Sequence, residues 1–207
     1  MTDIAKTTFI FLRHGEPVGG KIFRGSTDDP LTELGWKQLN DSVINLSFDE
    51  IVTSPLKRCS AFAEALQKNL SLPLHTVNDL QEMHLGEWEG LSVEQVDKLD
   101  SNALGKFWSE LHKNPPPKGE DFNDFETRVL SSWNKLNEQY THKEKSSTVL
   151  VVCHGGVMMV LLKELLKIPM ENILCIKLNY ASKVRVEVYD ASYSLKPQVY
   201  IDHGYEF

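Results

Sequence analysis

The 207-residue sequence predicts an α/β fold, a three-layer α/β/α sandwich with a mostly parallel central sheet. Short apolar runs rich in β-forming residues alternate along the chain with longer segments of helical periodicity. Two of those runs end in a histidine followed by a glycine. The chain is also too short for two unrelated enzyme domains. We therefore expect one domain over residues 1–207, with a helical insertion at about 83–121.

The first strand and the first helix follow from the N-terminal pattern. Residues 7–12 form an apolar, β-rich run that ends in Arg13-His14-Gly15-Glu16, as in a buried strand followed by a turn. Residues 15–29 are polar and glycine-rich and predict a loop. A helix opens at Thr32, whose side chain can cap it. The charged stretch thus lies at the carboxyl end of a strand, where open parallel sheets bind ligands.

The same alternation continues after this helix. A second strand is predicted at 50–53, followed by a helix over 56–70 with Pro55 in its first turn. Residues 72–77 add a third strand. From about 83 to 121 the periodicity weakens, which predicts an insertion over the sheet edge. Its two short helices are expected at residues 93–99 and 104–112.

The second half of the chain again pairs a strand with a histidine. A long amphipathic helix over 121–140 precedes a strand at 147–152. Cys153-His154-Gly155-Gly156 then leads into a helix over 157–166. The C-terminal tail alternates in the β manner at residues 173–178, 183–189 and 198–201.

Composition limits the expected partners and compartment. The net charge of −7 argues against nucleic acid as the main partner, because phosphate backbones are held by clustered Lys and Arg. No apolar run approaches the ~20 residues of a membrane span, and no signal peptide pattern precedes the first strand. These features predict a cytoplasmic protein without a membrane partner. The C-terminal strands could form an edge contact or stay capped, which leaves both a monomer and a homodimer open. The three cysteines form no CxxC pair and are expected to be reduced thiols.

A phosphoryl pocket is predicted where the two histidines meet. If both strands are central, His14 and His154 lie at the same sheet edge. Arg13 stands beside His14, and Arg58 lies in the first turn of the helix after the second strand. The Gly155-Gly156 turn opens a helix whose N-terminal N–H groups face this edge. Such donors around an imidazole suit a phosphoryl group.

A candidate general acid lies in a glycine-flanked turn that carries three glutamates. We interpret Glu87 and Glu89 as solvated loop charges, since exposed carboxylates are the norm. Glu82 is flanked by Leu80 and Met83 and is the better candidate for a carboxyl in an apolar wall.

Separate blocks in register carry a family resemblance. They are Leu12-Arg13-His14-Gly15-Glu16, Gly25, Asp29-Pro30-Leu31-Thr32, Gly35, Ser54-Pro55-Leu56-Lys57-Arg58, residues 82–90 and His154-Gly155-Gly156-Val157. From residue 8 to about residue 190 their order and spacing resemble the histidine phosphatase superfamily in its phosphoglycerate-mutase-like branch, which implies that branch's fold. A narrower resemblance, to the α-ribazole-phosphate phosphatases of cobalamin assembly, is carried by residues 16–20, 24–25, 28–30 and 119–122 with Arg128.

The resemblance implies a role for each matching residue. His14 would be the nucleophile that forms a phosphohistidine, and Glu82 the acid that protonates the leaving alkoxide and later deprotonates water. The non-transferred phosphoryl oxygens would be held by Arg13, Arg58, His154 and the helix opening at Gly155. Gly20 stands where many relatives have an asparagine, so either a main-chain N–H or a nearby donor such as Arg24 would replace that contact, or the affinity for phosphate is reduced. Neutral imidazole is a nucleophile at pH 7, and no metal or other cofactor is implied.

The favoured function is therefore a phosphomonoesterase for a small phosphorylated metabolite, with α-ribazole 5'-phosphate, hydrolysed to α-ribazole in cobalamin biosynthesis, as the leading substrate. A phosphoglycerate mutase or a broad-specificity sugar-phosphate phosphatase is the alternative. A mutase needs extra cations for a doubly anionic intermediate, yet no arginine lies between Arg58 and Arg128, and the insertion offers only lysines. A non-catalytic binding protein is disfavoured because every catalytic position is filled.

Two further interpretations stay open or are set aside. A metallohydrolase that uses His14, His84 and His154 is disfavoured, because no HxH or HxxxH spacing occurs. Aromatic side chains could wall the pocket, although packing in the core at helical spacing is the commoner outcome. They are Phe107, Trp108, Phe122 and Phe125.

Overall fold

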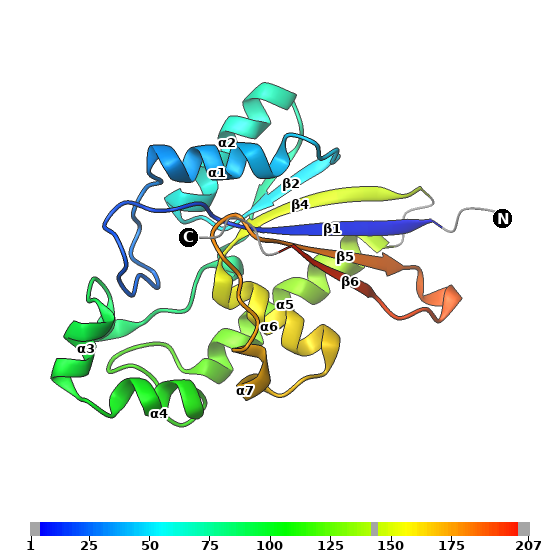
Figure 1. Ribbon diagram of the computed structural model, residues 1–207. Helices are drawn as coiled ribbons and strands as arrows, with labels where there is room; N and C mark the ends of the chain where they lie inside the picture. Colours follow the sequence, from blue (N-terminus) through cyan, green and yellow to red (C-terminus); the bar gives the residue numbers. More distant parts are fainter. Residues whose placement is uncertain (1–4, 142–144, 203–207) are drawn as a thin grey trace.

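The computed structural model describes residues 5–141 and 145–202 and has the predicted α/β architecture (Figure 1). A six-stranded sheet has the order β3-β2-β4-β1-β5-β6. The first four strands of that order run parallel, and β5 and β6 add an antiparallel edge, so the sheet is mostly parallel as predicted. The strands are β1 (Lys6–Arg13), β2 (Glu50–Thr53), β3 (Leu74–Thr76), β4 (Ser147–Cys153), β5 (Lys183–Tyr189) and β6 (Gln198–Asp202).

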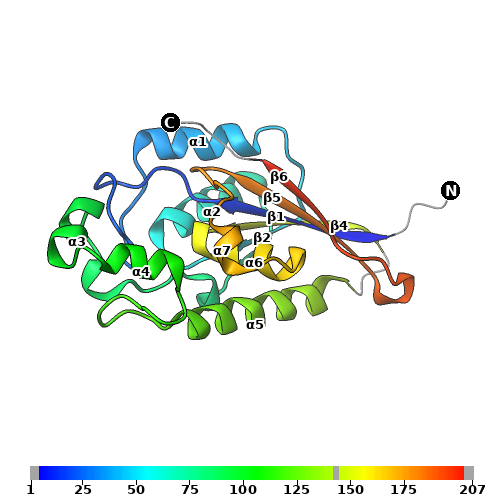
Figure 2. The ribbon, with the colours of Figure 1, turned by 60° about the horizontal axis from the view of Figure 1, so that its bottom comes forward.

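Helices cover both faces of the sheet (Figures 1 and 2). On one face lie α1 and α2, on the other α5, α6 and α7, and the predicted insertion supplies α3 and α4 toward the carboxyl ends of the parallel strands. Their bounds are α1 (Glu33–Val43), α2 (Lys57–Leu70), α3 (Val93–Leu99), α4 (Ala103–Ser109), α5 (Phe122–Thr141), α6 (Gly155–Leu166) and α7 (Met170–Ile173). Short 3₁₀ helices occupy Asn78–Leu80, Gly86–Trp88 and Ala191–Tyr193.

Alternation along β1 explains why the core has two sides. Phe9 and Phe11 are buried in the cluster that contains α5 and α6 side chains, whereas Ile10 and Leu12 are buried against α1 and α2. Successive side chains of a strand point to opposite faces of its sheet. The strand is thus packed from both sides, which fixes the position of its carboxyl end at Arg13.

The loop after β1 is held against the start of α1. Thr32 caps this helix as predicted, because its hydroxyl accepts the N–H of Gly35 at 2.9 Å. A Cβ on Gly15 would lie 2.2 Å from the carbonyl oxygen of Gly35, so only glycine permits this close approach. The main-chain position of His14 is therefore fixed by both β1 and α1.

Two predicted elements differ in the structure. Residues 173–178 are not a strand: Ile173 ends α7, and its N–H donates to Pro169 O in a helical turn, followed by a turn from Ile176 N to Ile173 O. Leu174, Ile176 and Leu178 are at least partly buried while residues 175 and 177 are exposed, and this pattern imitates β alternation. The second insertion helix ends at Ser109 rather than 112, and the chain continues in hydrogen-bonded turns.

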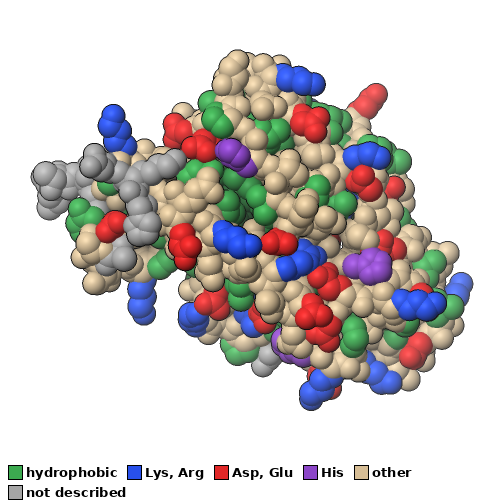
Figure 3. Space-filling model, turned by 180° about the vertical axis from the view of Figure 1, so that it is seen from behind, with side chains coloured by type: hydrophobic (Ala, Val, Ile, Leu, Met, Phe, Trp, Pro, Cys, Tyr) green, Lys and Arg blue, Asp and Glu red, His purple; other side chains and the backbone are tan. Residues whose placement is uncertain are grey.

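The outer surface mixes both signs of charge. On the face in Figure 3, Lys and Arg side chains lie between Asp and Glu side chains. Within residues 5–141 and 145–202, no helix is long and apolar enough to cross a membrane.

Candidate active site

The structure brings the two histidines together at the carboxyl ends of β1 and β4. These strands are paired so that Arg13 lies opposite Cys153, and the N–H of His14 donates to Cys153 O at 3.0 Å. The ring centroids of His14 and His154 are 5.2 Å apart. Each imidazole is the first side chain beyond a central strand, which is why residues so distant in sequence meet.

His14 has the protonation state of a nucleophile. Its side chain is buried, and Nδ1 lies 2.8 Å from Gly15 O. A carbonyl oxygen only accepts, so Nδ1 carries the proton and Nε2 keeps its lone pair. Burial lowers the pKa of His14 well below its usual value, and the charges of Arg13 and Arg58 lower this pKa further. The imidazole is therefore neutral at pH 7.

Arg13 and Arg58 present buried donors beside this imidazole. Arg58 donates to Thr27 O at 2.6 Å and to Gly25 O at 2.7 Å, which fixes its guanidinium. Arg13 donates to the carbonyl of Leu178 and stacks over Tyr180, with 4.7 Å from Cζ to the ring centre. Among the described residues, nothing accepts from the buried Nε–H of either arginine. An unpaired buried donor costs ~1–3 kcal/mol, so both favour an incoming anion.

His154 is fully buried and faces side chains that the sequence did not point to. Its Nε2 lies 2.7 Å from Ser54 Oγ and 3.6 Å from Cys59 Sγ. Burial lowers the pKa of His154 well below its usual value, and the charge of Arg58 adds to this effect. Ser54 is the first residue after β2, so the strand-end position was the signal that could have found it.

Arg24 lines the pocket but also holds the loop that carries it. Its Nη2 donates to Val18 O at 2.6 Å and to Gly20 O at 2.7 Å, and its Nε pairs with Asp29 at 3.1 Å. Gly20 has a φ of 75°, a left-handed conformation that favours glycine over asparagine. Gly20, the position at which the resemblance would place an asparagine, thus lies in a turn that Arg24 closes.

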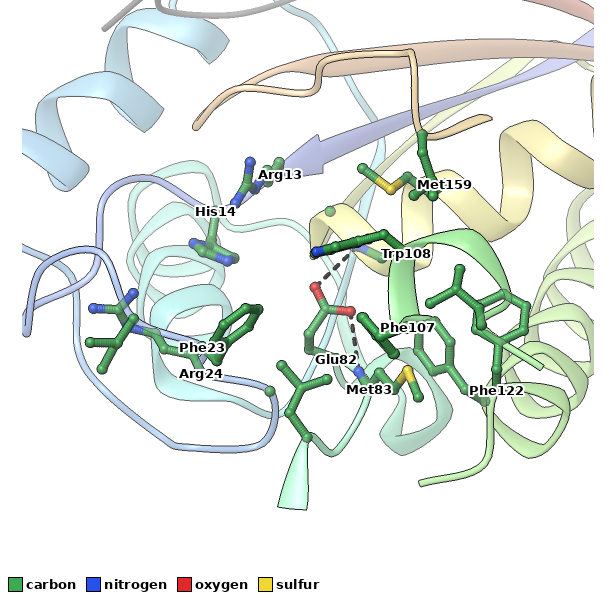
Figure 4. Close-up of a pocket in the computed structure, with 18 of the residues that line it drawn as sticks. Arg13, His14, Phe23, Arg24, Glu82, Met83, Phe107, Trp108, Phe122 and Met159 are labelled. Carbon is green, nitrogen blue, oxygen red and sulfur yellow. Dashed lines mark hydrogen bonds between the residues drawn. The ribbon is translucent and has the colours of Figure 1, made fainter. Parts of the chain in front are cut away.

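Glu82 lies in the same pocket, within reach of the α6 N-terminus. Its Oε2 accepts the N–H of Gly156 at 3.1 Å, and its Oε1 accepts the N–H of Met83 at 3.1 Å (Figure 4). A Cβ on Gly156 would lie 2.3 Å from Oε1, so this glycine permits the approach. Gly155 also lines the pocket, where its Cβ would lie 3.3 Å from Arg13 Nε.

The two other glutamates of this segment have different environments. Glu87 is exposed and pairs with Lys118 at 2.6 Å, as expected of a surface charge. The expectation for Glu89 is wrong, because it is largely buried and accepts bonds from Ser26, Thr27 and Leu85. Burial alone would raise the pKa of Glu89, but these hydrogen bonds lower it. Glu89 therefore ties together the two loops of the site, and the hydroxyls of residues 26 and 27 bind it.

The pocket has a volume of about 290 Å³ and two unlike ends. In Figure 4, Arg13, His14 and Arg24 lie on one side of Glu82, whereas Phe107 and Phe122 lie on the other. Apolar side chains make up most of the pocket lining. They are Ile22, Phe23, Met83, Leu85, Phe107, Trp108, Leu111, Phe122, Phe125, Met159, Met170 and Leu174.

The aromatic residues serve both the pocket and the core. Phe107, Phe122 and Phe125 are at most 4% exposed and belong to the main core cluster, yet they also line the pocket. Trp108 lines it with 47% of its surface exposed. The two interpretations made from sequence are therefore not alternatives here.

His84 is not brought to the two buried histidines. It does not line the pocket that contains His14, and its Nε2 lies 3.9 Å from Glu89. No group of three His, Cys, Asp or Glu side chains within residues 5–141 and 145–202 is arranged to hold a metal ion.

Comparisons with known proteins find a matching family model and several similar proteins. The family model described as histidine phosphatase superfamily (branch 1) matches residues 9–198. Similar curated proteins include the phosphatase PhoE of Bacillus subtilis (31% identical over 164 residues, 77% of each chain). They also include the adenosylcobalamin/α-ribazole phosphatase of Escherichia coli (28% over 165 residues, 77% of this chain and 79% of that protein).

Relatives with other printed activities match to a similar degree. A 2,3-bisphosphoglycerate-dependent phosphoglycerate mutase of Rhizobium etli is 26% identical over 182 residues, which is 83% of this chain and 86% of the mutase. The solved structure of a mycobacterial glucosyl-3-phosphoglycerate phosphatase superposes with a TM-score of 0.82. It is 26% identical and covers 97% of this chain and 100% of its own.

Proposed function

This chain belongs to the histidine phosphatase superfamily (branch 1), a membership that supports phosphatase activity, and from it we propose that the protein hydrolyses phosphate monoesters through a phosphohistidine on His14. The observation that carries the proposal is the state of His14. Its proton is held on Nδ1 by Gly15 O, which leaves Nε2 as a nucleophile among the unpaired donors of Arg13 and Arg58.

The proposed chemistry has two displacements at phosphorus. First, His14 Nε2 forms a bond to phosphorus, the ester P–O bond breaks, and Glu82 gives its proton to the leaving oxygen. Second, water attacks the phosphohistidine, Glu82 takes a proton from it, and the P–N bond breaks to release phosphate. Arg13, Arg58 and His154 would stabilise the equatorial oxygens in both steps, since phosphoryl transfer depends mainly on placement and charge stabilisation.

We further propose α-ribazole 5'-phosphate as the substrate. The leaving-group end of the pocket is walled by aromatic and methionine side chains, which suit a flat aromatic base attached to the ribose. The curated relative from Escherichia coli, named for α-ribazole, adds support at 28% identity.

The charge distribution disfavours the mutase alternative and a leaving group that carries a carboxylate. The cations of the described pocket lining are Arg13, Arg24 and Arg58. Arg13 and Arg24 lie on the His14 side of Glu82 (Figure 4), and Arg58 is close enough to His14 for its charge to lower the pKa of that imidazole. No insertion lysine is part of that lining. A carboxylate at the apolar end would thus be desolvated without a partner, which is costly.

Trapping of the covalent intermediate tests the reaction. Wild-type protein quenched with a ³²P-labelled substrate should carry an acid-labile, base-stable label, and His14→Ala should carry none and show no turnover. His154→Ala should keep the label and lose about 10²- to 10³-fold in rate, the usual effect of one lost stabilising donor. Wild-type-like turnover in His14→Ala would disprove the nucleophile assignment.

A substrate panel tests the leaving group. We expect the highest kcat/KM for α-ribazole 5'-phosphate, compared with glucosyl-3-phosphoglycerate and simple sugar phosphates, and no isomerisation of 3-phosphoglycerate. A higher kcat/KM for a sugar phosphate would leave the phosphatase proposal standing and remove α-ribazole as the substrate.

A further inference from the structure

Arg128, on α5, uses all of its hydrogen-bonding capacity on two segments around Glu82. A guanidinium has five N–H donors, and here the side chain makes five bonds. Nε and Nη2 bind the Glu120 carboxylate at 2.6 and 2.9 Å. Nη1 donates to Asp79 O and Gln81 O at 2.8 Å each, and Nη2 donates to Glu82 O at 3.1 Å.

Glu120 extends this cluster to the other side of Glu82. Its Oε2 accepts the N–H of His84 at 3.1 Å, and its own N–H donates to His84 O at 2.8 Å. The main chain is therefore held at residues 81 and 82 by Arg128 and at residue 84 by Glu120. We call Arg128 and Glu120 together the clamp.

The clamp fixes the residue that carries the carboxyl, while the carboxyl itself is aimed by other groups. Both oxygens of Glu82 accept backbone N–H groups, from Met83 and Gly156. The clamp does not line the pocket, so neither of its members touches a bound ester. Arg128 also lies over Phe125, 4.8 Å from the ring centre, and Phe125 does line the pocket.

We propose that Arg128 is a positioning residue for the general acid, holding Glu82 at the distance from the ester oxygen that proton transfer requires. The proposal rests on the function proposed above, in which Glu82 supplies that proton. A bidentate ion pair anchored on a long helix is more rigid than a loop alone, and a misplacement of about 1 Å can slow a reaction by about 10²-fold. Lysine cannot replace this geometry, because an ammonium lacks the planar fork.

The test compares two kinds of leaving group in Arg128→Lys. Only a poor leaving group needs the acid, so the variant should slow the pre-steady-state burst of the best alkyl ester from the substrate panel by about 10- to 10²-fold. The burst with p-nitrophenyl phosphate should change much less. In the Glu82→Gln background, Arg128→Lys should cause no further loss, because the two residues act as one unit.

Two matched variants separate positioning from general damage. Lys135 is exposed, lies on the same helix as Arg128, and has its Nζ 3.9 Å from Asp79 Oδ2. Lys135→Ala removes this contact and should leave both bursts unchanged. Glu120→Gln weakens the clamp from its other side and should slow the alkyl-ester burst selectively, but by a smaller factor. This variant keeps the test possible if Arg128→Lys fails to fold.

The outcomes distinguish this inference from the proposed function. Equal slowing of both esters by Arg128→Lys, or losses that add to those of Glu82→Gln, would overturn the positioning role while phosphohistidine formation on His14 still stands. If Glu82→Gln shows no selectivity for alkyl esters, the acid assignment and the positioning role both fall. Loss of the phosphohistidine would instead refute the proposed function itself.

Discussion

The two ends of the pocket are built from different parts of the fold. The phosphate end comes from strand ends and the first turns of helices. There the side chains of His14 and Arg58 are buried and that of Arg13 is half-buried, and main-chain oxygens hold all three. His154 is buried beside His14. The leaving-group end combines core side chains with the insertion, and its member Trp108 is about half exposed (Figure 4).

This difference separates what the two ends can determine. The phosphate end is rigid and charged, so it fixes the reaction and would treat every phosphate monoester alike. The leaving-group end has few polar groups and depends on side chains of α4 and α5. Substitutions at the first end should therefore change rate constants, and substitutions at the second should change which ester binds.

At the boundary between the two ends, the largest expected effect is that of Glu82→Gln. This change keeps the shape of the side chain and removes the proton that it can transfer. The burst with an alkyl ester should fall by about 10²- to 10⁴-fold, the usual contribution of a positioned acid. The burst with p-nitrophenyl phosphate should fall much less, because that phenolate leaves largely unaided.

Glu87→Gln is the matched control, since this neighbour is exposed and pairs only with Lys118 among the contacts described. Equal losses of burst rate for the two esters in Glu82→Gln, or a larger selective loss in Glu87→Gln, would show that the acid is misassigned.

Gly156→Ala should reproduce this selectivity at a smaller size. The added Cβ would lie 2.3 Å from Glu82 Oε1, the mobile end of a side chain, so the carboxyl shifts and the fold is kept. We expect the alkyl-ester burst to fall by about 10- to 10²-fold. Gly105→Ala is the control, because a Cβ there meets nothing within 4 Å. An unchanged alkyl-ester burst in Gly156→Ala would mean that Glu82 acts from another position.

The sequence predicted the phosphate end well because strand ends are local signals. A β-rich run followed by His and Gly marks the edge position directly, and the parallel pairing of β1 with β4 then follows from the alternation of elements. The alternation of apolar residues misled at residues 173–178, where the end of a short helix and a turn leave residues 174, 176 and 178 at least partly buried. Tyr180, which stacks on Arg13, follows that segment and was missed with it.

The leaving-group end and the loop ties could not be predicted in this way. Glu89 accepts bonds from residues 26 and 27, and Arg128 binds carbonyls of residues 79, 81 and 82, contacts between loops that have no periodicity of their own. Phe107 both packs in the core and lines the pocket, and this double role also depends on where the insertion folds back. Such facts depend on tertiary placement rather than on local pattern.

Burial of His154 should make the stability of the protein depend on pH. Because the pKa of His154 is lowered, the unfolded chain binds a proton below pH 6.5 that the native protein does not. Stability is then lost as pH falls, by about 1.4 kcal/mol per pH unit for this group until its folded-state pKa is reached. The measurement is chemical denaturation in phosphate-free buffer at several pH values. As pH falls, the free energy of unfolding of wild type should decrease by this amount relative to that of His154→Gln.

Trp108→Ala, at the leaving-group end, serves as the control. Its free energy of unfolding should change with pH in the same way as that of wild type over the same pH range. Parallel curves for wild type and His154→Gln would instead mean that His154 titrates normally in the native state.

The smallest expected effect is that of Trp108→Ala on substrate choice. Trp108 packs edge-on against Phe107, with ring centres 5.0 Å apart, and presents its exposed part to the pocket. Loss of one aromatic contact costs about 1 kcal/mol, which is about five-fold in KM for an ester with an aromatic leaving group. Glycerol 3-phosphate, too short to reach the apolar end, should show no change, and Leu99→Ala on α3 should affect neither substrate. Equal changes in KM for both esters in Trp108→Ala would contradict the separate roles of the two ends, because the insertion would then also shape the phosphate site.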